Sequence, residues 1–437
     1  MDSMWAVGLL CVLAAAAYFA WAAWDRRHTR RVKAIAADIA SLGDDAVPAS
    51  IHPVIDPDVC IGSGACINAC PEHDVLGLID GRAHLVNPLA CVGHGACLAA
   101  CPVHAITLVF GTATRGVELP AVGPDFQTNR PGVYVVGELA GMGLIRNAVE
   151  QGRQAIGYIR ASGRRGRGGD LDAVIVGGGP AGIAAMLALV DAGMRGVLLE
   201  QDQFGGTVRH YPRGKVVMTG TIDLPGYGRL KQRTMTKEQL AHVWDDILDT
   251  TRMPVETGVR VDGLRADGDA WVVSAGERTW RAANVILAIG RRGSPRRLGV
   301  SGEDQAHVHY RLLEPDPFAG KHVLVVGGGN AAAECALALA DAGKCAGVAL
   351  SYRRAQLARL RGAVRQRIES AFASGRVTPL LATEVVSIGH ADVTLRRAAG
   401  EVDHRRADAV IVQIGGTPPG DLLARLGIDM VTKRGEA

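Results

Sequence analysis

Residues 172–182 read DAVIVGGGPAG, an apolar run that leads directly into a glycine-rich loop. An Ala- and Leu-rich segment follows, and a second apolar run, residues 196–200, ends in an acid at Glu200. This order predicts a strand, a tight loop, a helix and a second strand, the unit that binds a dinucleotide at the helix N-terminus. Glu200 lies about twenty residues beyond the loop, where a carboxylate accepts hydrogen bonds from ribose hydroxyls. The residues predicted to hold this nucleotide are Gly177, Gly179, Pro180, Ala181, Gly182 and Glu200.

A second copy of the pattern, KHVLVVGGGNAA, occupies residues 321–332. Its following apolar run, residues 347–351, is followed by Tyr352-Arg353-Arg354 rather than by an acid. A guanidinium gains from the extra charge of a ribose 2′-phosphate, which a carboxylate would repel. The sequence therefore favours NADPH at this site, with NADH as the open alternative. The residues predicted to bind it are Gly327, Gly329, Asn330, Ala331, Arg353, Arg354 and Arg359.

Upstream of both loops, residues 60–71 (CIGSGACINACP) and residues 91–102 (CVGHGACLAACP) are near copies of each other. Bacterial ferredoxins space their ligands C-x2-C-x2-C-x3-C-P, and the fourth cysteine of each run binds the other cluster. The spacing therefore predicts two iron–sulfur clusters, with a zinc site or chance as the weaker alternative. On the crossing pattern, one cluster takes Cys60, Cys66 and Cys101, and the other takes Cys91, Cys97 and Cys70.

Each run lacks a cysteine at the second ligand position, which is Ser63 in the first run and His94 in the second. Two interpretations stay open. In one, Ser63 oxygen or His94 nitrogen binds iron and a [4Fe-4S] core survives at an altered potential; in the other, the corner is vacant and a [3Fe-4S] core is expected. His94 is the better candidate ligand. A neutral imidazole in place of a thiolate would raise that cluster's potential and make it the later electron acceptor.

Residues 4–24 carry no charge and have about the length needed to cross a hydrocarbon core. Basic residues crowd residues 26–33 directly afterwards. By the positive-inside rule, these features predict a single-pass helix in the cell inner membrane, with the cofactor domains in the cytoplasm. A cleaved signal peptide is the alternative, but the chain begins Met1-Asp2-Ser3-Met4, without the usual basic start.

Composition limits the function classes. The 437 residues include 48 Lys and Arg against 44 Asp and Glu, and this balance is too even to indicate nucleic acid as the main partner. The 56 glycines and the aromatic share of 4% are typical of an α/β protein with many tight turns. Cys11, Cys335 and Cys345 show no pairing pattern, which argues against a disulfide framework.

The two nucleotide units, one placed inside the other, resemble the low-molecular-weight thioredoxin reductase class of flavoproteins over residues 111–437. Residues 284–290 (NVILAIG) resemble the strand and turn that leave the FAD domain of that family. Residues 204–207 (FGGT), 211–213 (YPR) and 351–353 (SYR) are closer to its bacillithiol disulfide reductase branch. The resemblance implies FAD at the first loop, with Gly206, Thr207, Val261 and Gly290 as further contacts.

Two departures from this family matter for function. Its members carry a redox C-x-x-C before the second glycine loop, whereas residues 310–316 here read YRLLEPD, so thioredoxin-type reduction is effectively excluded. Its members also end in a strand and helix that complete the FAD site, and here the matching residues 126–148 lie upstream. The FAD domain is therefore predicted to be circularly permuted, which termini that meet at a surface tolerate. The displaced segment would contact FAD through Gly137, Glu138 and Ile145.

The predicted fold class is α/β, with two Rossmann-like three-layer nucleotide-binding domains, a small α+β dicluster ferredoxin-like domain and one N-terminal transmembrane helix. Between the cysteine runs, residues 75–79 and 84–86 alternate around Asp80-Gly81, which predicts a hairpin. The predicted domains are a transmembrane anchor at 1–24, a basic stalk at 25–51, the dicluster domain at 52–110, the permuted FAD segment at 111–165, the FAD domain at 170–300, the NAD(P)H domain at 301–415 and a return to the FAD domain at 416–437.

A hydride donor and one-electron clusters in one chain need a flavin between them. The sequence therefore predicts a membrane-anchored oxidoreductase that passes electrons from NADPH through FAD to the clusters and a one-electron acceptor, such as a ferredoxin or a cytochrome, or in reverse. No catalytic acid, base or nucleophile is predicted. A small-disulfide reductase and a non-catalytic redox sensor or scaffold are the alternatives, and the sequence leaves a homodimer open.

Overall fold

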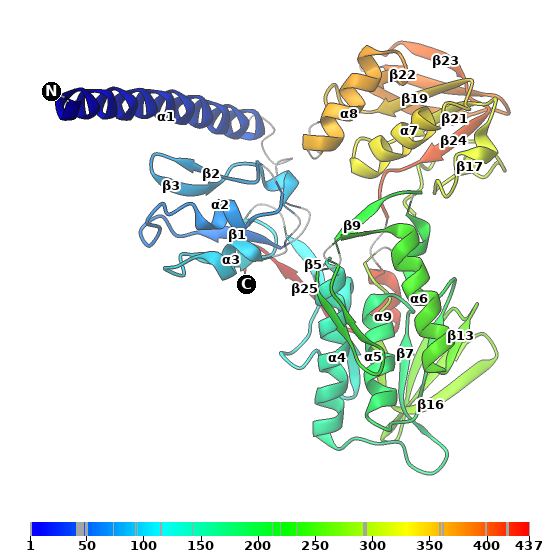
Figure 1. The fold of residues 1–437 in the computed structure, drawn as a ribbon. Helices are drawn as coiled ribbons and strands as arrows, with labels where there is room; N and C mark the ends of the chain where they lie inside the picture. Colours follow the sequence, from blue (N-terminus) through cyan, green and yellow to red (C-terminus); the bar gives the residue numbers. More distant parts are fainter. Residues whose placement is uncertain are drawn as a thin grey trace. The chain divides into compact units, whose positions relative to one another are not determined.

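The computed structural model describes the chain except for residues 1, 41–47, 49–50, 73, 92, 94, 114–115, 142, 212, 219, 233, 292–294, 358–359, 361, 398–399, 417–418 and 437. The chain divides into two compact units (Figure 1). The first contains Met1–Arg115 and Arg434–Ala437, and the second contains Gly116–Lys433. Each unit has hydrophobic cores of its own.

The first unit begins with one long helix, α1 (Asp2–Ala40), which continues without a break into the basic segment. Eight of the 21 residues at 4–24 are alanine, whose single methyl group adds little apolar surface. Of the helices in the described part of the chain, none combines the length and the apolar character that a membrane span requires. The predictions of a transmembrane anchor and of an inner-membrane location are therefore wrong.

Two short strand pairs and two short helices form the cysteine-rich module of this unit. The predicted hairpin is confirmed: its strands pair in antiparallel register, and both turn residues, Asp80 (φ 51°) and Gly81 (φ 79°), are left-handed, as a tight hairpin requires. The elements of the module are β1 (His52–Ile55), which pairs with β4 (Ile106–Val109), β2 (Leu76–Ile79), which pairs with β3 (Arg82–Leu85), and the helices α2 (Ala65–Ala69) and α3 (Ala96–Ala100).

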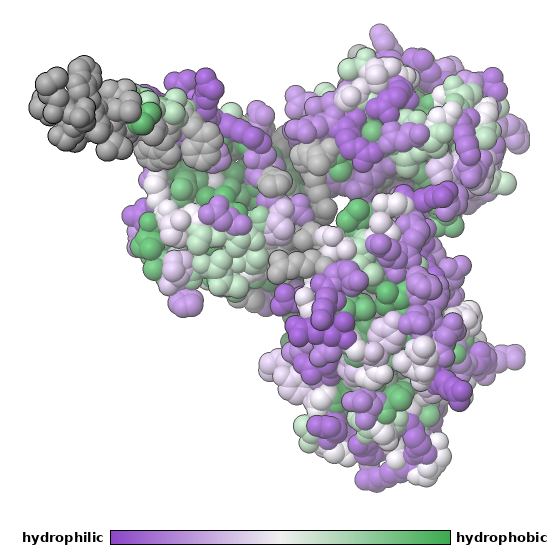
Figure 2. Space-filling model, viewed as in Figure 1, coloured by the Kyte–Doolittle hydropathy of each residue, from purple (hydrophilic) through white to green (hydrophobic). Residues whose placement is uncertain are grey.

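The core of the module is small and contains cysteine. Cys66 and Cys97 are both buried in it, on α2 and α3 respectively. The visible face of the module carries pale to deep green residues in Figure 2, and Val54, Val59, Ile61 and Leu98 are its exposed large apolar side chains among the described residues. A core this small leaves much of its apolar surface in contact with water, so bound prosthetic groups would add substantially to its stability.

The C-terminal half of α1 packs on this module. Val32 is buried there, and a Cβ on Gly77 would lie 2.6 Å from its Cγ1. Arg31 pairs with Asp74 at 2.6 Å, and Lys33 pairs with Asp80 at 2.8 Å. Because exposed ion pairs contribute little, the contact depends mainly on the close approach of Val32 to the β2 backbone.

The second unit contains a seven-stranded sheet in which five strands are parallel to one another. Alternate residues of β7 point to opposite faces, so that Ala173 and Ile175 join one core while Val174 and Val176 join the other. Helices α4 (Ile145–Ser162), α5 (Pro180–Asp191) and α6 (Lys237–Thr251) contribute to the first of these cores. The strand order is β13 (Val255–Thr257), β8 (Gly196–Glu200), β7 (Leu171–Val176), β16 (Arg278–Leu287), β15 (Ala270–Ala275) and β14 (Gly263–Asp267), with β6 (Val133–Val135) beside the end of β16.

A second parallel sheet follows the same plan. One of its faces packs on α7 (Asn330–Ala342) and α8 (Gly362–Ala373), and the other packs on a three-stranded antiparallel sheet. The five strands are β17 (Val308–His309), β24 (Ala409–Val412), β18 (His322–Val326), β19 (Gly347–Tyr352) and β20 (Thr378–Leu381); the covering sheet consists of β21 (Thr383–Ile388), β22 (Asp392–Arg397) and β23 (Val402–Arg406).

The end of the chain returns to the first sheet. Leu423, Leu426 and Ile428 belong to the core on the far face of that sheet, behind the strands β7 and β16. The short helix α9 (Gly420–Arg425) leads to β25 (Met430–Lys433), which pairs with β5 (Val117–Pro120). The remaining short strands are β9 (Val216–Met218) with β12 (Thr234–Thr236), and β10 (Ile222–Leu224) with β11 (Gly228–Leu230).

Candidate nucleotide and iron–sulfur sites

The first glycine loop joins β7 to α5. Gly177 has a φ of 105°, which favours glycine, and a Cβ on Gly182 would lie 1.9 Å from Gly177 O, so neither position accepts a side chain. Gly179 is different, because no described atom lies within 4 Å of an ideal Cβ there. The loop therefore presents its backbone and the start of α5, including Pro180 and Ala181, to open space.

Glu200, the last residue of β8, is fixed beside this loop. It is buried, and its two carboxylate oxygens accept the backbone N–H groups of Gly178 at 2.6 Å and of Asp202 at 2.8 Å. The strand that ends in Glu200 therefore places the carboxylate beside the loop, which is where a ribose-binding acid must lie.

The upstream segment reaches the same loop. Gly137 has a φ of 79° and donates its N–H to Gln151 Oε1 at 2.7 Å. A Cβ on Gly137 would lie only 3.0 Å from Ala181 Cβ. Its neighbour Glu138 follows in the first turn of a 3-10 helix. Two residues that sequence reasoning missed make this approach close: Gln151, and Gly152, at which a Cβ would lie 2.1 Å from Ala181 O.

Four more of the predicted FAD contacts lie in turns or at the ends of elements, and one lies in the core. A Cβ on Gly206 (φ 59°) would lie 2.9 Å from Gly179 Cα, and Thr207 follows Gly206 in the same short turn. Gly290 (φ 66°) lies just beyond the end of β16, and Ile145 is the first residue of α4. Val261 is buried in the core on the far face of the sheet.

These residues fit a bound dinucleotide. The space next to Gly179 is one that a Cβ would fill, the first turn of α5 supplies backbone N–H groups to it, and the buried Glu200 lies at the end of the adjacent strand. The assignment of single residues to FAD stays a prediction that this geometry supports.

The second glycine loop joins β18 to α7. A Cβ on Gly327 (φ 145°) would lie 2.3 Å from Gln413 O, whereas no described atom lies within 4 Å of one on Gly329. Asn330 and Ala331 begin α7 behind it. The aromatic ring of Tyr352 lies against Gly328, a contact that the sequence did not reveal.

The basic residues follow directly after this ring. Arg353 is exposed and Arg354 is half-buried, at the carboxyl end of β19 where a nucleotide ribose would lie in this fold. Arg359, the third residue predicted to bind phosphate, lies outside the described residues. The two described arginines thus lie at this edge of the sheet.

Polar contacts join the two nucleotide-binding halves of this unit. Lys215 forms an ion pair with Glu334 of α7, and Arg311 lies 3.6 Å from Asp202. His210 also contacts Asp202, at 2.9 Å, and its pKa is lowered by burial and by the Arg311 charge. None of these residues was identified from the sequence, because the contacts form only when the two sheets meet.

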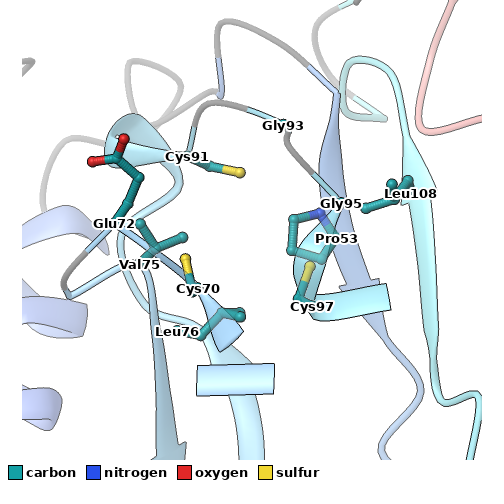
Figure 3. A pocket seen from close by; sticks show the side chains of 10 residues that line it. All are labelled: Pro53, Cys70, Glu72, Val75, Leu76, Cys91, Gly93, Gly95, Cys97 and Leu108. Carbon is teal, nitrogen blue, oxygen red and sulfur yellow. The ribbon is translucent and has the colours of Figure 1, made fainter. Parts of the chain in front are cut away.

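Cys70, Cys91 and Cys97 line one cavity of the module, here called the Cys91 cavity. Figure 3 shows their sulfurs around one open space, with Glu72 at its edge. The cavity draws its cysteines from both runs, as the crossing pattern predicted. Glu72 was missed, since a residue after Cys-Pro carries no ligand signal in sequence.

The second cavity, here called the Cys60 cavity, is lined by Cys60, Cys66 and Cys101, again from both runs. Backbone N–H groups point at two of the sulfurs, from Ala83 to Cys60 Sγ at 3.5 Å and from Ala105 to Cys101 Sγ at 3.3 Å. Hydrogen bonds of this kind tune the potential of a cluster.

Ser63 and His94 occupy the two ligand positions that lack a cysteine. Ser63 lies on the wall of the Cys60 cavity with its side chain exposed, whereas His94 lies outside the described residues. Within the described chain, no group of three His, Cys, Asp or Glu side chains could hold a single metal ion. A cluster binds each cysteine at a different iron and so spreads its ligands more widely.

Burial governs the protonation of the cavity thiols. It raises the pKa of Cys66, Cys70 and Cys91, and that of Cys97 to about 11. Repulsion within each set adds to the effect, from Cys60 and Cys101 on Cys66 and from Cys91 and Cys70 on Cys97. Iron binding would therefore release protons from thiols that are otherwise neutral.

A model of the pyridine nucleotide-disulphide oxidoreductase family matches residues 174–436, more than half of the chain. The chain belongs to this family. A 4Fe-4S dicluster domain model matches residues 52–102, which contain both cysteine runs. The chain is thus an FAD-dependent oxidoreductase with an FAD- and NAD(P)-binding fold and a dicluster domain, as predicted.

The chain is similar to several named reductases. The ferredoxin–NADP reductase of Ignicoccus hospitalis is 33% identical over 186 residues, which cover 42% of this chain and 57% of that protein. The bacilliredoxin reductase of Bacillus subtilis is 22% identical over 268 residues, which cover 60% and 82%. The solved bacillithiol disulfide reductase of Staphylococcus aureus has a TM-score of 0.54 at 19% identity, over 60% and 81% of the two chains, a likeness that shows the fold alone.

This family member has no cysteine in the segment before its second glycine loop, residues 310–316. Of the two cysteines in the second nucleotide-binding half, Cys335 is fully buried on α7, and burial together with the nearby Cys345 raises its pKa far above the ordinary value. A buried, protonated thiol is a poor nucleophile. Neither residue therefore replaces the missing dithiol.

Proposed function

We propose that this chain passes electrons from NADPH through FAD to two iron–sulfur clusters and on to a one-electron acceptor, or runs the same path in reverse. The observation that carries the proposal is the presence, in one chain, of two glycine-loop nucleotide sites and two cavities with three cysteines each. Hydride carriers and clusters differ in the number of electrons they move, and only a converter joins them.

FAD, when bound, supplies that conversion, since a flavin accepts a hydride and releases single electrons. The residues of the chain bind and orient. Gly179 leaves room for a pyrophosphate, the N-terminus of α5 faces it, and Glu200 meets the ribose. No proton transfer by a side chain is needed for this electron path, and no catalytic acid or base is assigned.

We also propose that the FAD domain is circularly permuted. Two observations support this. β6 comes before the glycine loop in sequence yet lies parallel to β16 as an edge strand of the same sheet, and Gly137 of the same segment contacts Ala181 of α5. Helix α4 then packs on α5 through Gly152.

The permutation has a paired test on α4. Gly152→Ala would place a Cβ 2.1 Å from Ala181 O, whereas Gly157→Ala, one and a half turns along, meets no described atom within 4 Å. We expect the first variant to lose flavin and the second to keep it. Equal flavin content in both would show that α4 does not support the flavin site.

Arg353 and Arg354 support NADPH rather than NADH as the nucleotide at the second loop, because a 2′-phosphate would meet cations at the end of β19. A ferredoxin-type protein is the proposed acceptor or donor, with a cytochrome as the alternative. The ferredoxin–NADP reductases among the relatives support the first choice.

Reduction of a small disulfide is the second candidate, which the fold of the bacillithiol disulfide reductase favours. A non-catalytic redox sensor is the third. The missing dithiol and the burial of Cys335 count against the second, and the two paired cofactor modules count against the third.

The test uses the full chain, purified without oxygen, with iron, sulfide and flavin quantified and EPR spectra recorded before and after NADPH. We expect both cofactor types and NADPH-dependent cluster signals. Replacing Cys66 and Cys97 by alanine should leave flavin reduction nearly intact and abolish electron transfer to a ferredoxin. Transfer at the full rate in that variant would make the flavin, and not the clusters, the exit.

A further inference from the structure

The two cysteine cavities differ at the corner that lacks a cysteine. In the Cys60 cavity that corner is Ser63, which lies on the cavity wall with an exposed side chain. Its Oγ accepts a hydrogen bond from Ala65 N–H at 3.5 Å, at the long limit for such bonds. The hydroxyl therefore belongs to the local turn before α2, and that turn is open to solvent.

A serine hydroxyl is a poor substitute for a thiolate at this corner. Iron–sulfur clusters are held by soft sulfur ligands, whereas oxygen ligands suit harder cations. To bind as strongly as Cys60 or Cys66, Ser63 would also have to lose a proton that a hydroxyl holds much more tightly than a thiol. One iron is thus left without a strong ligand from the described residues of this cavity.

The surroundings of the corner suit a small external thiolate. Ile61, two residues before Ser63 and on the same cavity wall, is 66% exposed and offers an apolar surface. Arg82 supplies positive charge, since its Nη1 donates to Cys60 O at 3.0 Å. The loop that carries Ser63 also packs on the Arg82 turn, because a Cβ on Gly62 would lie 2.0 Å from Gly81 O.

The Cys91 cavity offers the opposite charge. Glu72 lies at its edge and brings a carboxylate to the opening (Figure 3). An incoming anion would meet a carboxylate there and a guanidinium at the Cys60 cavity. An external thiolate should therefore distinguish the two cavities.

We infer that the cluster in the Cys60 cavity has one iron, beside Ser63, that binds a small external thiolate. In this step the thiol loses its proton to the buffer, its sulfur forms a bond to iron, the solvent molecule at that corner leaves, and no electron is transferred. The inference rests on the proposed function only in requiring that the clusters form.

The test uses the full chain with clusters reconstituted without oxygen, reduced with dithionite and titrated with 2-mercaptoethanol. We expect one of the two cluster EPR signals to change saturably in the wild-type chain. In Ser63→Cys the new thiolate occupies the corner, so the change should disappear. Asn68→Cys, an exposed position on α2 that does not line the cavity, is the matched control and should behave as the wild type.

A second measurement does not depend on thiol binding. Mild oxidation with ferricyanide in the presence of EDTA should remove about one more iron per chain from the wild type and from Asn68→Cys than from Ser63→Cys, because an iron without a cysteine ligand is labile and Ser63→Cys supplies that ligand in the Cys60 cavity. A thiol effect that persists unchanged in Ser63→Cys overturns the inference, as does a wild-type chain in which neither signal responds. Clusters that form and accept electrons from NADPH would leave the proposed function standing in both cases, whereas a chain without iron and sulfide would refute both.

Discussion

The two glycine loops share a backbone and differ in the residue that closes them. In each, the middle glycine faces the last residue of the next strand. A Cβ on Gly178 would lie 3.1 Å from Glu200 Cβ, and one on Gly328 would lie 2.2 Å from the Tyr352 ring. The first loop is therefore bordered by a carboxylate and the second by an aromatic ring with Arg353 after it. The glycine loop indicates that a dinucleotide binds. The residues at the end of the next strand indicate which dinucleotide it is.

The sharpest difference lies six residues into the pattern, where the first loop has Gly182 and the second has Ala332. Gly182→Ala would place a methyl group 1.9 Å from a backbone oxygen that cannot rotate away, whereas Ala332 is accommodated and fully buried. We expect Gly182→Ala to lower the free energy of unfolding by about 3 kcal/mol, the upper end for an overpacked site, and to cause loss of flavin. Flavin content and chemical unfolding of the variant measure it; an unchanged flavin content would mean that the two loops tolerate the same residues.

The third glycine of each loop tests which nucleotide each loop binds. A Cβ on Gly179 or on Gly329 meets no described atom, so alanine at either place should leave folding intact and project into the space for phosphate. Gly179→Ala should lower flavin content, and Gly329→Ala should raise KM for NADPH at least tenfold (about 1.4 kcal/mol) with flavin retained. Each variant is the control of the other. If both variants lost the same nucleotide, the assignment of the loops would be wrong.

We expect the arginines after β19 to favour NADPH over NADH by a smaller factor. A charge-assisted hydrogen bond is worth about 1.5–3 kcal/mol, and because Arg353 is exposed we expect the lower end, about a tenfold loss of NADPH preference in Arg353→Ala. The ratio of kcat/KM for the two nucleotides measures it. Arg260→Ala, an exposed arginine of the first nucleotide-binding half, is the control and should leave the ratio unchanged.

Steric rules explain which parts of the fold could be predicted. The glycine loops and the Asp80-Gly81 hairpin follow from backbone conformations that few residues adopt, and the cysteine sets follow from a fixed ligand spacing. The assignment of residues 126–148 to the FAD domain came from the family resemblance and not from residues 133–135 themselves, whose composition fits any buried strand.

Tertiary contacts explain what the sequence did not reveal. Gly152 and Tyr352 matter only because another element approaches them, and nothing in their local sequence marks the approach. Residues 4–24 misled for a different reason. An uncharged run of sufficient length predicts a membrane span, but many of its residues are alanine, which contributes little apolar surface.

The smallest effect we expect concerns how the strand before each loop is anchored at its start. In the second sheet Asp408 does this: it accepts His322 N–H at 2.8 Å, and this bond, with further ones from Arg406 and the His322 ring, lowers the pKa of Asp408 to about 2 from an ordinary value of 3.8. A carboxyl group whose pKa is lower in the folded than in the unfolded chain stabilises the fold at pH values above its unfolded pKa. This contribution is lost as the pH falls through the folded pKa. The difference in unfolding midpoint between the wild type and Asp408→Asn should therefore be constant above about pH 4 and shrink towards pH 2. The matching strand start in the first sheet is held by Asp172, which is buried and accepts Arg195 N–H at 2.7 Å. A gap for Asp408→Asn that stayed constant down to pH 2 would show that the carboxylate charge does not anchor β18.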